Sequence, residues 1–166
     1  MTIGQNNMPV IGVEELHFAK LLNEDKDISK IKYDTPVWFE GVKQIGAKPK
    51  VQATPIHGDN RLMTQLSSVP TIDVTLEVTD LTDEQQSYLL GHKLAEDGGI
   101  LESDGDYAPT VAMLFKSPKA KGGDRFMVFY AGEFEPFDED IKGQEGKITP
   151  SYRKLKGTFK IGRAHV

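Results

Sequence analysis

The stretch TIDVTLEVT, residues 71–79, alternates apolar and polar side chains without interruption. Alternate side chains of an extended strand point to opposite faces, so one face is apolar and the other carries the carboxylates Asp73 and Glu77. The apolar residues are Ile72, Val74, Leu76 and Val78. Such a strand predicts an antiparallel sheet that covers a core on one side and meets water on the other.

The segment that follows this strand changes to a helical pattern. Thr82 and Gln85 form a capping-box pair, and Gly91 stands where a helix commonly ends in the left-handed conformation. We expect one short helix over residues 82–90. Hydrophobic burial docks this helix on the flank of the sheet through Leu81, Tyr88 and Leu89.

Further stretches with strand character stand on both sides of this unit. The run FMVFY, residues 126–130, is apolar on both faces, which predicts a central strand covered on both sides. The fold class is therefore mainly β, an antiparallel β-sandwich with one flanking α-helix, in a single domain over residues 1–166. The other expected strands span residues 13–22, 45–53, 100–102, 110–116, 125–130, 132–137 and 152–159.

The two ends of the chain differ from the rest of the domain. Residues 1–12 are expected to form an N-terminal arm. Residues 160–166 read KIGRAHV, the translation of AAG ATC GGA AGA GCA CAC GTC, which resembles a common sequencing adapter. We interpret residues 161–166 as a non-native scar that replaces a lost native C-terminus. A genuine polar C-terminus is the alternative.

Composition excludes several classes of protein. The net charge of −5 argues against a protein that binds nucleic acid through a basic face. The chain has no cysteine, so disulfides and thiolate sites are excluded. No apolar run approaches the ~18 residues that cross a bilayer, and the start has no secretory-signal pattern. These features favour a cytoplasmic product without membrane contact.

Catalytic and ligand-binding patterns are missing from the sequence. No two of its four histidines have the i, i+4 spacing of a helical metal site, and no G-x-S-x-G, phosphate-binding or dinucleotide-binding glycine motif occurs. Asp104 and Asp106 stand two apart, as in calcium loops, but lack the downstream glutamate, so a solvated turn is favoured. We predict no enzyme, no catalytic residue, no cofactor and no metal site.

Four segments together resemble one known family. They are MPVIGVEELHFAKL (8–21), DLTDEQQSYLLGHK (80–93), GILESDGDYAPTVAMLFKSPKAKGGDRFMVFYAGEFEP (99–136) and KGTF (156–159). In this order they resemble the major tail protein, or tail tube protein, family of long-tailed bacteriophages and prophages of Gram-positive bacteria. The resemblance covers about residues 8–160. Its most specific parts are LLGHK (89–93), the Ala108-Pro109 pair, FKS (115–117), FMVFYAGEF (126–134) and the final KGTF.

The resemblance implies a structural role. Family members are expected to adopt a β-sandwich with a flanking helix and to form hexameric rings that stack into a tube around a tape-measure protein. DNA would leave the capsid through this tube without specific binding. The implied partners are other copies of the chain, the tape-measure protein, the tail terminator and the tail-tip proteins. The implied location is the virion tail, and the host cytoplasm during assembly.

Two surfaces are predicted to serve this assembly. Residues 54–69 have a weak pattern with a turn at HGDN (57–60), and their apolar side chains need a partner, so we expect an arm that contacts a neighbouring ring. Its apolar residues are Ile56, Leu62, Met63 and Leu66. A strand pair packed on its own domain is the alternative.

We also expect Asp73 and Glu77 to face the lumen, as a negative wall toward DNA phosphates. Lys154 and Lys156 would temper this wall if their strand pairs nearby. The outer surface of the tube is the alternative location for this face.

Other functions stay open at this stage. One is the tube protein of a contractile injection apparatus, which shares the ring architecture. Another is a calcium-dependent carbohydrate-binding β-sandwich that uses Asp104 and Asp106 for calcium and its aromatic side chains for sugar.

Overall fold

The computed structural model describes residues 8–23, 25, 27–51, 53–67, 70–137, 139, 141–147 and 150–165. One α-helix and a short 3-10 helix accompany the strands in this part of the chain, so the fold is mainly β, as the sequence predicts. In chain order the elements are β1 (Glu14–Lys20), η1 (Ile28–Lys30), β2 (Val37–Trp38), β3 (Val42–Lys50), β4 (Ala53–Gly58), β5 (Arg61–Ser67), β6 (Thr71–Val78), α1 (Asp83–Leu90), β7 (Lys93–Leu94), β8 (Ile100–Leu101), β9 (Val111–Pro118), β10 (Asp124–Phe134) and β11 (Arg153–His165).

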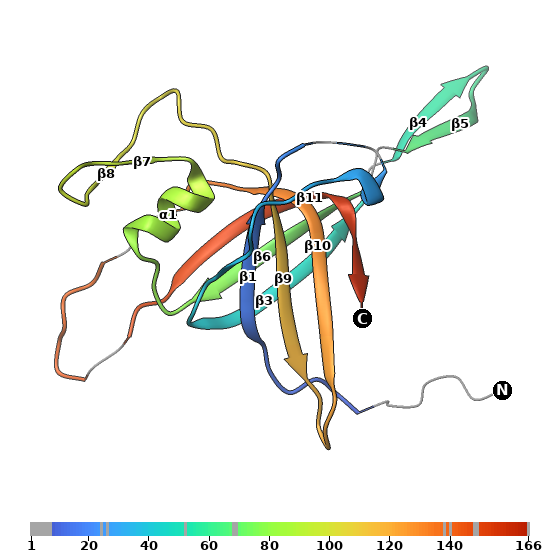
Figure 1. Ribbon diagram of the computed structural model, residues 1–166. Coiled ribbons are helices and arrows are strands. Elements are labelled where there is room, and N and C mark those ends of the chain that lie inside the picture. The colour runs from blue at the N-terminus through green and yellow to red at the C-terminus, as the bar shows by residue number, and fades with distance from the viewer. Residues whose placement is uncertain are drawn as a thin grey trace.

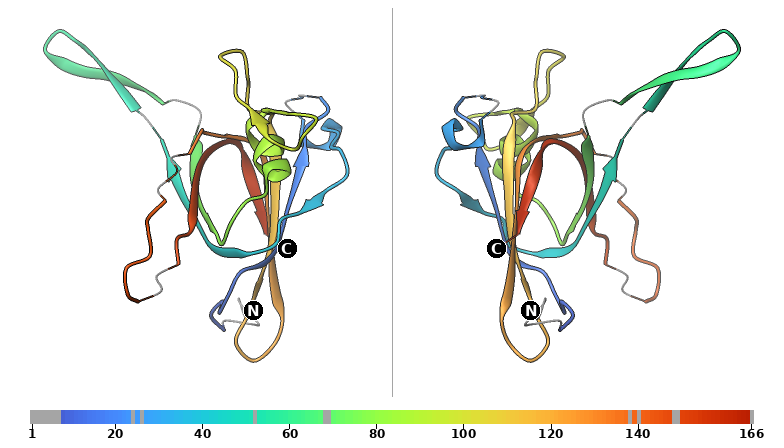
Figure 2. Two further views of the ribbon diagram at one scale, coloured as in Figure 1. Left: turned by 90° about the vertical axis from the view of Figure 1, so that its left-hand side faces the viewer. Right: turned by 90° about the vertical axis from the view of Figure 1, so that its right-hand side faces the viewer.

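Seven strands form one antiparallel sheet in the order β2-β1-β9-β10-β11-β6-β3. The sheet bends so that a front layer (β2, β1, β9 and β10) faces a rear layer (β3, β6 and residues 153–159 of β11) across one core (Figures 1 and 2). The bend lies within β11, because residues 153–159 pair with β6, whereas residues 161–165 pair only with β10. The two layers of this sandwich are therefore parts of a single continuous sheet.

A glycine stands where the two layers meet. Gly132 pairs with Val111 on one side and Phe159 on the other, next to a register shift in both ladders. A Cβ added to Gly132 would lie 2.4 Å from Cγ of Phe159, so the aromatic ring packs directly on the bare glycine backbone. Because pairing continues through this irregularity, the two strands expected over 125–130 and 132–137 are one strand, β10.

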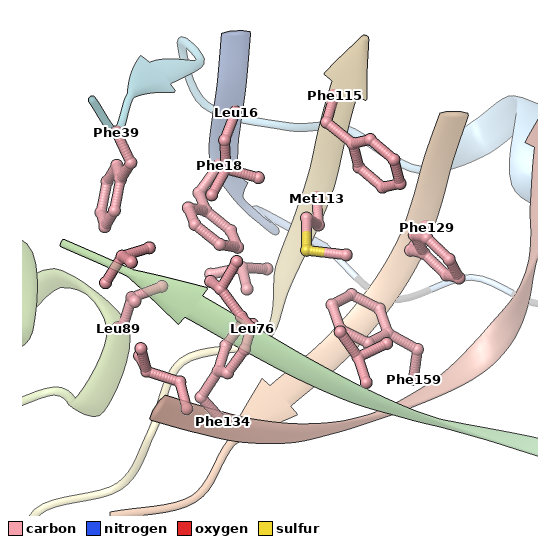
Figure 3. Packing of buried hydrophobic residues seen from close by; sticks show 14 of the residues in the cluster. Leu16, Phe18, Phe39, Leu76, Leu89, Met113, Phe115, Phe129, Phe134 and Phe159 are labelled. Atoms are coloured by element: carbon pink, nitrogen blue, oxygen red, sulfur yellow. The ribbon is translucent and has the colours of Figure 1, made fainter. Parts of the chain in front are cut away.

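The core draws its side chains from both layers (Figure 3). The Phe18 ring makes edge contacts with Phe39 and Phe134, with centroid separations of 4.8 and 5.4 Å. The Phe159 ring contacts Phe129 at 5.5 Å and Phe134 at 6.0 Å. On β6 the four apolar residues predicted to face inward are all buried, which confirms the predicted alternation: Ile72, Val74, Leu76 and Val78.

The predicted helix is present as α1 and covers one flank of the sheet (Figure 1). The Thr82 side chain accepts a hydrogen bond from the Gln85 backbone, the Gln85 side chain accepts one from the Thr82 backbone, and Gly91 ends the helix with φ of 74°. Leu81 and Leu89 are buried against the core. The Tyr88 hydroxyl accepts a hydrogen bond of 3.1 Å from the backbone N–H of β1 residue 20, which ties the helix to the front layer.

The central strand β10 is covered differently from the prediction. Phe129 points into the core and is fully buried, whereas Phe126 is 45% exposed on the opposite face. Part of that face is covered by the chain between β1 and β2, whose Tyr33 hydroxyl donates a 2.7 Å hydrogen bond to the carbonyl of Tyr130. A single chain therefore buries this strand fully on one face only.

The chain ends also differ from the sequence expectations. The last strand was expected to end at residue 159, but β11 continues to His165 because its backbone pairs with β10. The interpretation of residues 161–166 as a scar stays a prediction. Of the predicted arm, residues 8–12 run along the β9–β10 turn, where Ile11 N–H donates to the Pro118 carbonyl. Residues 1–7 lie outside the described residues.

We expect Gly132→Ala to lower the free energy of unfolding by about 1–3 kcal/mol, because the added methyl group enters space held by the Phe159 ring. Gly143→Ala is the matched control, since nothing lies within 4 Å of a Cβ added there. That control should change the free energy of unfolding by less than about 0.5 kcal/mol. Urea titration followed by circular dichroism measures both. An unchanged midpoint for Gly132→Ala would show that the layers do not depend on this contact.

Candidate functional site

The outer face of the rear layer carries the two predicted carboxylates. Directly opposed residues on neighbouring antiparallel strands point to the same face. Asp73 stands between Lys48 of β3 and Thr158 of β11. Glu77 stands between Gln44 of β3 and Lys154 of β11. The pairing of β11 beside β6 therefore places lysines next to the carboxylates, as the sequence analysis considered for Lys154 and Lys156.

Two ion pairs cross this face. Lys50 Nζ lies 2.7 Å from Asp73 Oδ2, and Lys43 Nζ lies 3.3 Å from Glu77 Oε1. The hydrogen bond from Lys50 to Asp73 raises the pKa of the Lys50 ammonium above its ordinary value, with the charges of Asp73 and then Glu135 acting in the same direction. The Lys43 ammonium also lies 3.5 Å from the centroid of the Tyr152 ring, a cation–π contact.

The net charge of this face differs from the sequence expectation. On β3, β6 and residues 153–159 of β11, lysines outnumber the carboxylates Asp73 and Glu77. These lysines are Lys43, Lys48, Lys50, Lys154 and Lys156. With five lysines and two carboxylates, this face carries a net positive charge and is not a negative wall. The sequence did not predict that the lysines of β3 lie beside these carboxylates. Only the β3–β6 register shows it.

The residues of the predicted arm form the hairpin β4–β5, which stands away from the main sheet (Figures 1 and 2). Its two-residue turn is Asp59-Asn60, with φ of 50° and 59°, the left-handed values that a tight hairpin turn requires. The predicted HGDN turn is confirmed. All residues of β4 and β5 except Gly58 are exposed.

Three of the four predicted apolar residues share one face of this hairpin. Ile56 pairs with Thr64 and Leu66 pairs with Thr54, so both side chains point the same way as Gly58. A Cβ added to Gly58 would lie 2.5 Å from the Met63 sulfur, which places Met63 over the same face. Ile56, Met63 and Leu66 are 40–62% exposed. Leu62 pairs with His57 and belongs to the other face. A lone two-stranded hairpin is marginally stable in water, so this apolar face needs a partner.

A second surface lies in residues 91–109, which we call the acidic segment. It contains the short pair β7–β8 and the exposed apolar residues Leu94, Leu101 and Tyr107, of which Tyr107 is 86% exposed. Five carboxylates and one lysine give it a net charge of −4: Glu96, Asp97, Glu102, Asp104, Asp106 and Lys93. No local pattern in the sequence indicates this surface, because its apolar residues are scattered and follow no strand or helix period.

The predicted turn at Asp104 is present within this segment. The Asp106 carboxylate accepts a 2.9 Å hydrogen bond from the Ser103 backbone N–H, and the Asp106 N–H donates to the Ser103 carbonyl. The Asp106 carboxylate therefore closes a turn. Within the described ranges, no group of three or more His, Asp or Glu side chains is placed to hold a metal ion.

Membrane crossing has no helical basis in the described part of the chain. Its one α-helix, α1, does not have the length and apolar character that a span requires.

Comparison with known proteins identifies a family. The family model described as phage tail tube protein matches residues 48–144, which is more than half of the chain. The match includes the hairpin β4–β5, the two-faced strand β6, the helix α1 and strands β9 and β10. No curated protein matches the sequence significantly.

We expect the triple variant Ile56→Ser, Met63→Ser, Leu66→Ser to leave the free energy of unfolding within about 0.5 kcal/mol of the unmodified chain, because these side chains are exposed. Leu76→Ala is the reference, since Leu76 is fully buried and its truncation should cost about 2–5 kcal/mol. Chemical denaturation of both variants makes the comparison. A loss in the triple variant as large as that of Leu76→Ala would mean that the hairpin packs on its own subunit.

Proposed function

The chain belongs to the phage tail tube protein family, and on this basis we propose that its copies form hexameric rings that stack into the tube through which phage DNA leaves the capsid. The family is structural and not enzymatic, so the chain is a structural subunit of the phage tail. The observation that carries the proposal is the family match over residues 48–144. The rigid sandwich and its projecting hairpin support it, because they supply a wall element and a means of contact between copies.

The wall of the conduit is the outer face of the rear layer. Three neighbouring strands present it, and the alternation of β6 directs Asp73 and Glu77 outward while the apolar set fills the core. The ion pairs Lys50–Asp73 and Lys43–Glu77 occupy ammonium groups that would otherwise attract phosphates. The five lysines outnumber these two carboxylates, so the face stays net positive, but its contacts with phosphates are independent of sequence and are screened within roughly 8 Å at physiological salt. DNA can therefore slide along this face without specific binding.

The hairpin β4–β5 is the contact between rings. Its apolar face is exposed in one copy and stands clear of the main sheet (Figure 2). Burial of Ile56, Met63 and Leu66 against another copy would stabilise the stack by about 25 cal/mol for each Å² of apolar surface removed from water.

The assembled tube has further partners under this proposal. It encloses a tape-measure protein, a tail terminator closes one end and tail-tip proteins form the other. Assembly takes place in the cytoplasm of a Gram-positive host before the tube becomes part of the virion. The family match supports a place for this tube in the phage tail.

We expect the concentrated protein to form rings or tubes in negative-stain electron microscopy. Deletion of residues 57–65 should leave single rings and remove long tubes, because the deletion takes away the tip of the hairpin with Met63 and also removes Thr64, the strand partner of Ile56. A chain that stays monomeric in every condition would contradict the proposed function. Tubes of unchanged length after the deletion would contradict only the role of the hairpin.

We expect Asp73→Lys with Glu77→Lys to leave tube formation intact and to impair DNA delivery. The change releases Lys43 and Lys50 from their ion pairs and adds two more ammonium groups to the same face, so the wall would hold phosphates. The matched control is Glu40→Lys with Asp124→Lys, which makes the same charge change at exposed positions outside the rear layer. Phage titre and DNA release measure delivery. Unaltered delivery in the Asp73, Glu77 variant would place this face on the outside of the tube.

A further inference from the structure

We infer that His92 and Glu102 form a pH-dependent clamp, which fastens the base of the β7–β8 pair to the end of α1. The clamp closes when the His92 ring gains a proton and loosens when the ring loses it. This inference goes beyond the proposed function. It rests on contacts within one copy and is independent of how copies assemble.

The two clamp residues stand opposite each other at the base of a small hairpin. The β7–β8 ladder pairs Lys93 with Leu101. Continuing this antiparallel register by one residue places His92 opposite Glu102, and directly opposed side chains point to the same face. The distance from His92 Nδ1 to Glu102 Oε1 is 3.9 Å.

The His92 ring is buried and lacks one of its bonds. Its side chain is only 10% exposed, and its Nδ1 atom is shielded from solvent and has no hydrogen-bond partner among the described residues. A buried polar atom without a partner costs free energy. The Glu102 side chain is 71% exposed and can turn. A movement of about 1 Å would bring its carboxylate within the distance of a charge-assisted hydrogen bond to Nδ1.

Protonation supplies what this contact needs. A protonated ring carries a hydrogen on Nδ1 and a positive charge, and histidine changes charge between about pH 5 and 8. Burial of the ring opposes that charge, but the carboxylate opposite and the C-terminal end of α1 attract it. No basic residue stands in the last turn of α1. Among the nearby charged groups, Lys93 points to the opposite face of the pair, and the Asp106 carboxylate is bonded to the Ser103 N–H.

Few other contacts hold the β7–β8 pair in place. Its ladder has two residue pairs, and a 2.7 Å hydrogen bond from the Ala95 N–H to the Gly99 carbonyl closes its turn. The pair lies beside α1 (Figure 1), and the chain returns to the helix end where Gly91 packs against the Tyr107 carbonyl. A unit with so few contacts opens locally at a small cost in free energy. One added ionic hydrogen bond therefore changes the open fraction measurably.

The direction of the pH effect follows from linkage between protonation and closure. The closed clamp binds the proton on His92 more tightly than the open clamp, because only the closed form brings the carboxylate to the ring. A fall in pH therefore favours closure, and this stabilisation is lost as the pH rises through the titration of the ring. Carboxylates keep their charge above about pH 5. The base of the acidic segment is thus held most firmly in mildly acidic solution.

Amide hydrogen exchange of the full chain, followed by mass spectrometry, tests the inference. The exchange of residues 93–102 is compared with that of the unstructured sequence at the same pH, which removes the intrinsic pH dependence of exchange. We expect protection to be about threefold higher near pH 5.5 than near pH 8, the effect of one partly exposed ion pair in the range where histidine titrates. His92→Gln and Glu102→Gln should each abolish this difference.

Two features keep the test decisive. Glu102 is exposed, so Glu102→Gln removes the charge without disturbing buried packing. His17→Gln is the matched control and should keep the difference, because the His17 Nδ1 is already bonded to the Glu15 carbonyl on β1. Protection that does not rise on acidification of the unmodified chain, or a rise that survives in Glu102→Gln, would overturn the inference. Both results leave the proposed function standing, since rings and tubes are not part of the measurement.

Discussion

The packing of the Phe159 ring on the bare backbone of Gly132 holds the two layers together. An open antiparallel sheet of seven strands twists but does not bring its own apolar face together without a sharp local bend. Here the bend lies in β11, whose first part pairs with β6 and whose last part pairs with β10. A side chain larger than hydrogen at position 132 would displace the ring that fills the inside of the bend. The bare backbone at this position therefore leaves room for the Phe159 ring between the two layers.

This bend places one set of apolar side chains in the core and leaves another set exposed. Once the layers face each other, the large apolar side chains of β1, β6, β9 and β11 that point inward are buried in one core. The apolar side chains of β4–β5 and β7–β8 cannot reach it, since these strand pairs lie outside the main sheet. Their exposure is therefore not a defect of packing. Substitutions on these small units leave the core unchanged, whereas substitutions in the core change whether a copy folds.

The sequence predicts those strands and helices whose signal lies within one short segment of the chain. The alternation of β6 and the capping box of α1 each lie within one short segment, and both are confirmed by the structure. The continuity of β10 across Gly132 and the extension of β11 to His165 depend on pairing with distant strands, so no local pattern shows them. The same reason applies to the lysines beside Asp73, which are distant in sequence and meet only through register. The hairpin was found through its unexplained apolar residues.

The way in which the hairpin is rooted has a mechanical consequence. It leaves β3 after Lys50 and returns to β6 at Thr71, and these two residues face each other across the ladder. Any pull on the hairpin therefore acts on the same end of two hydrogen-bonded neighbours and does not peel one from the other. From β6 the load passes along the strand axis into seven residue pairs with β11, from Ile72–Phe159 to Val78–Arg153, so that they resist it together in shear. A pull on the hairpin is thus resisted in the direction along which a sheet is strongest.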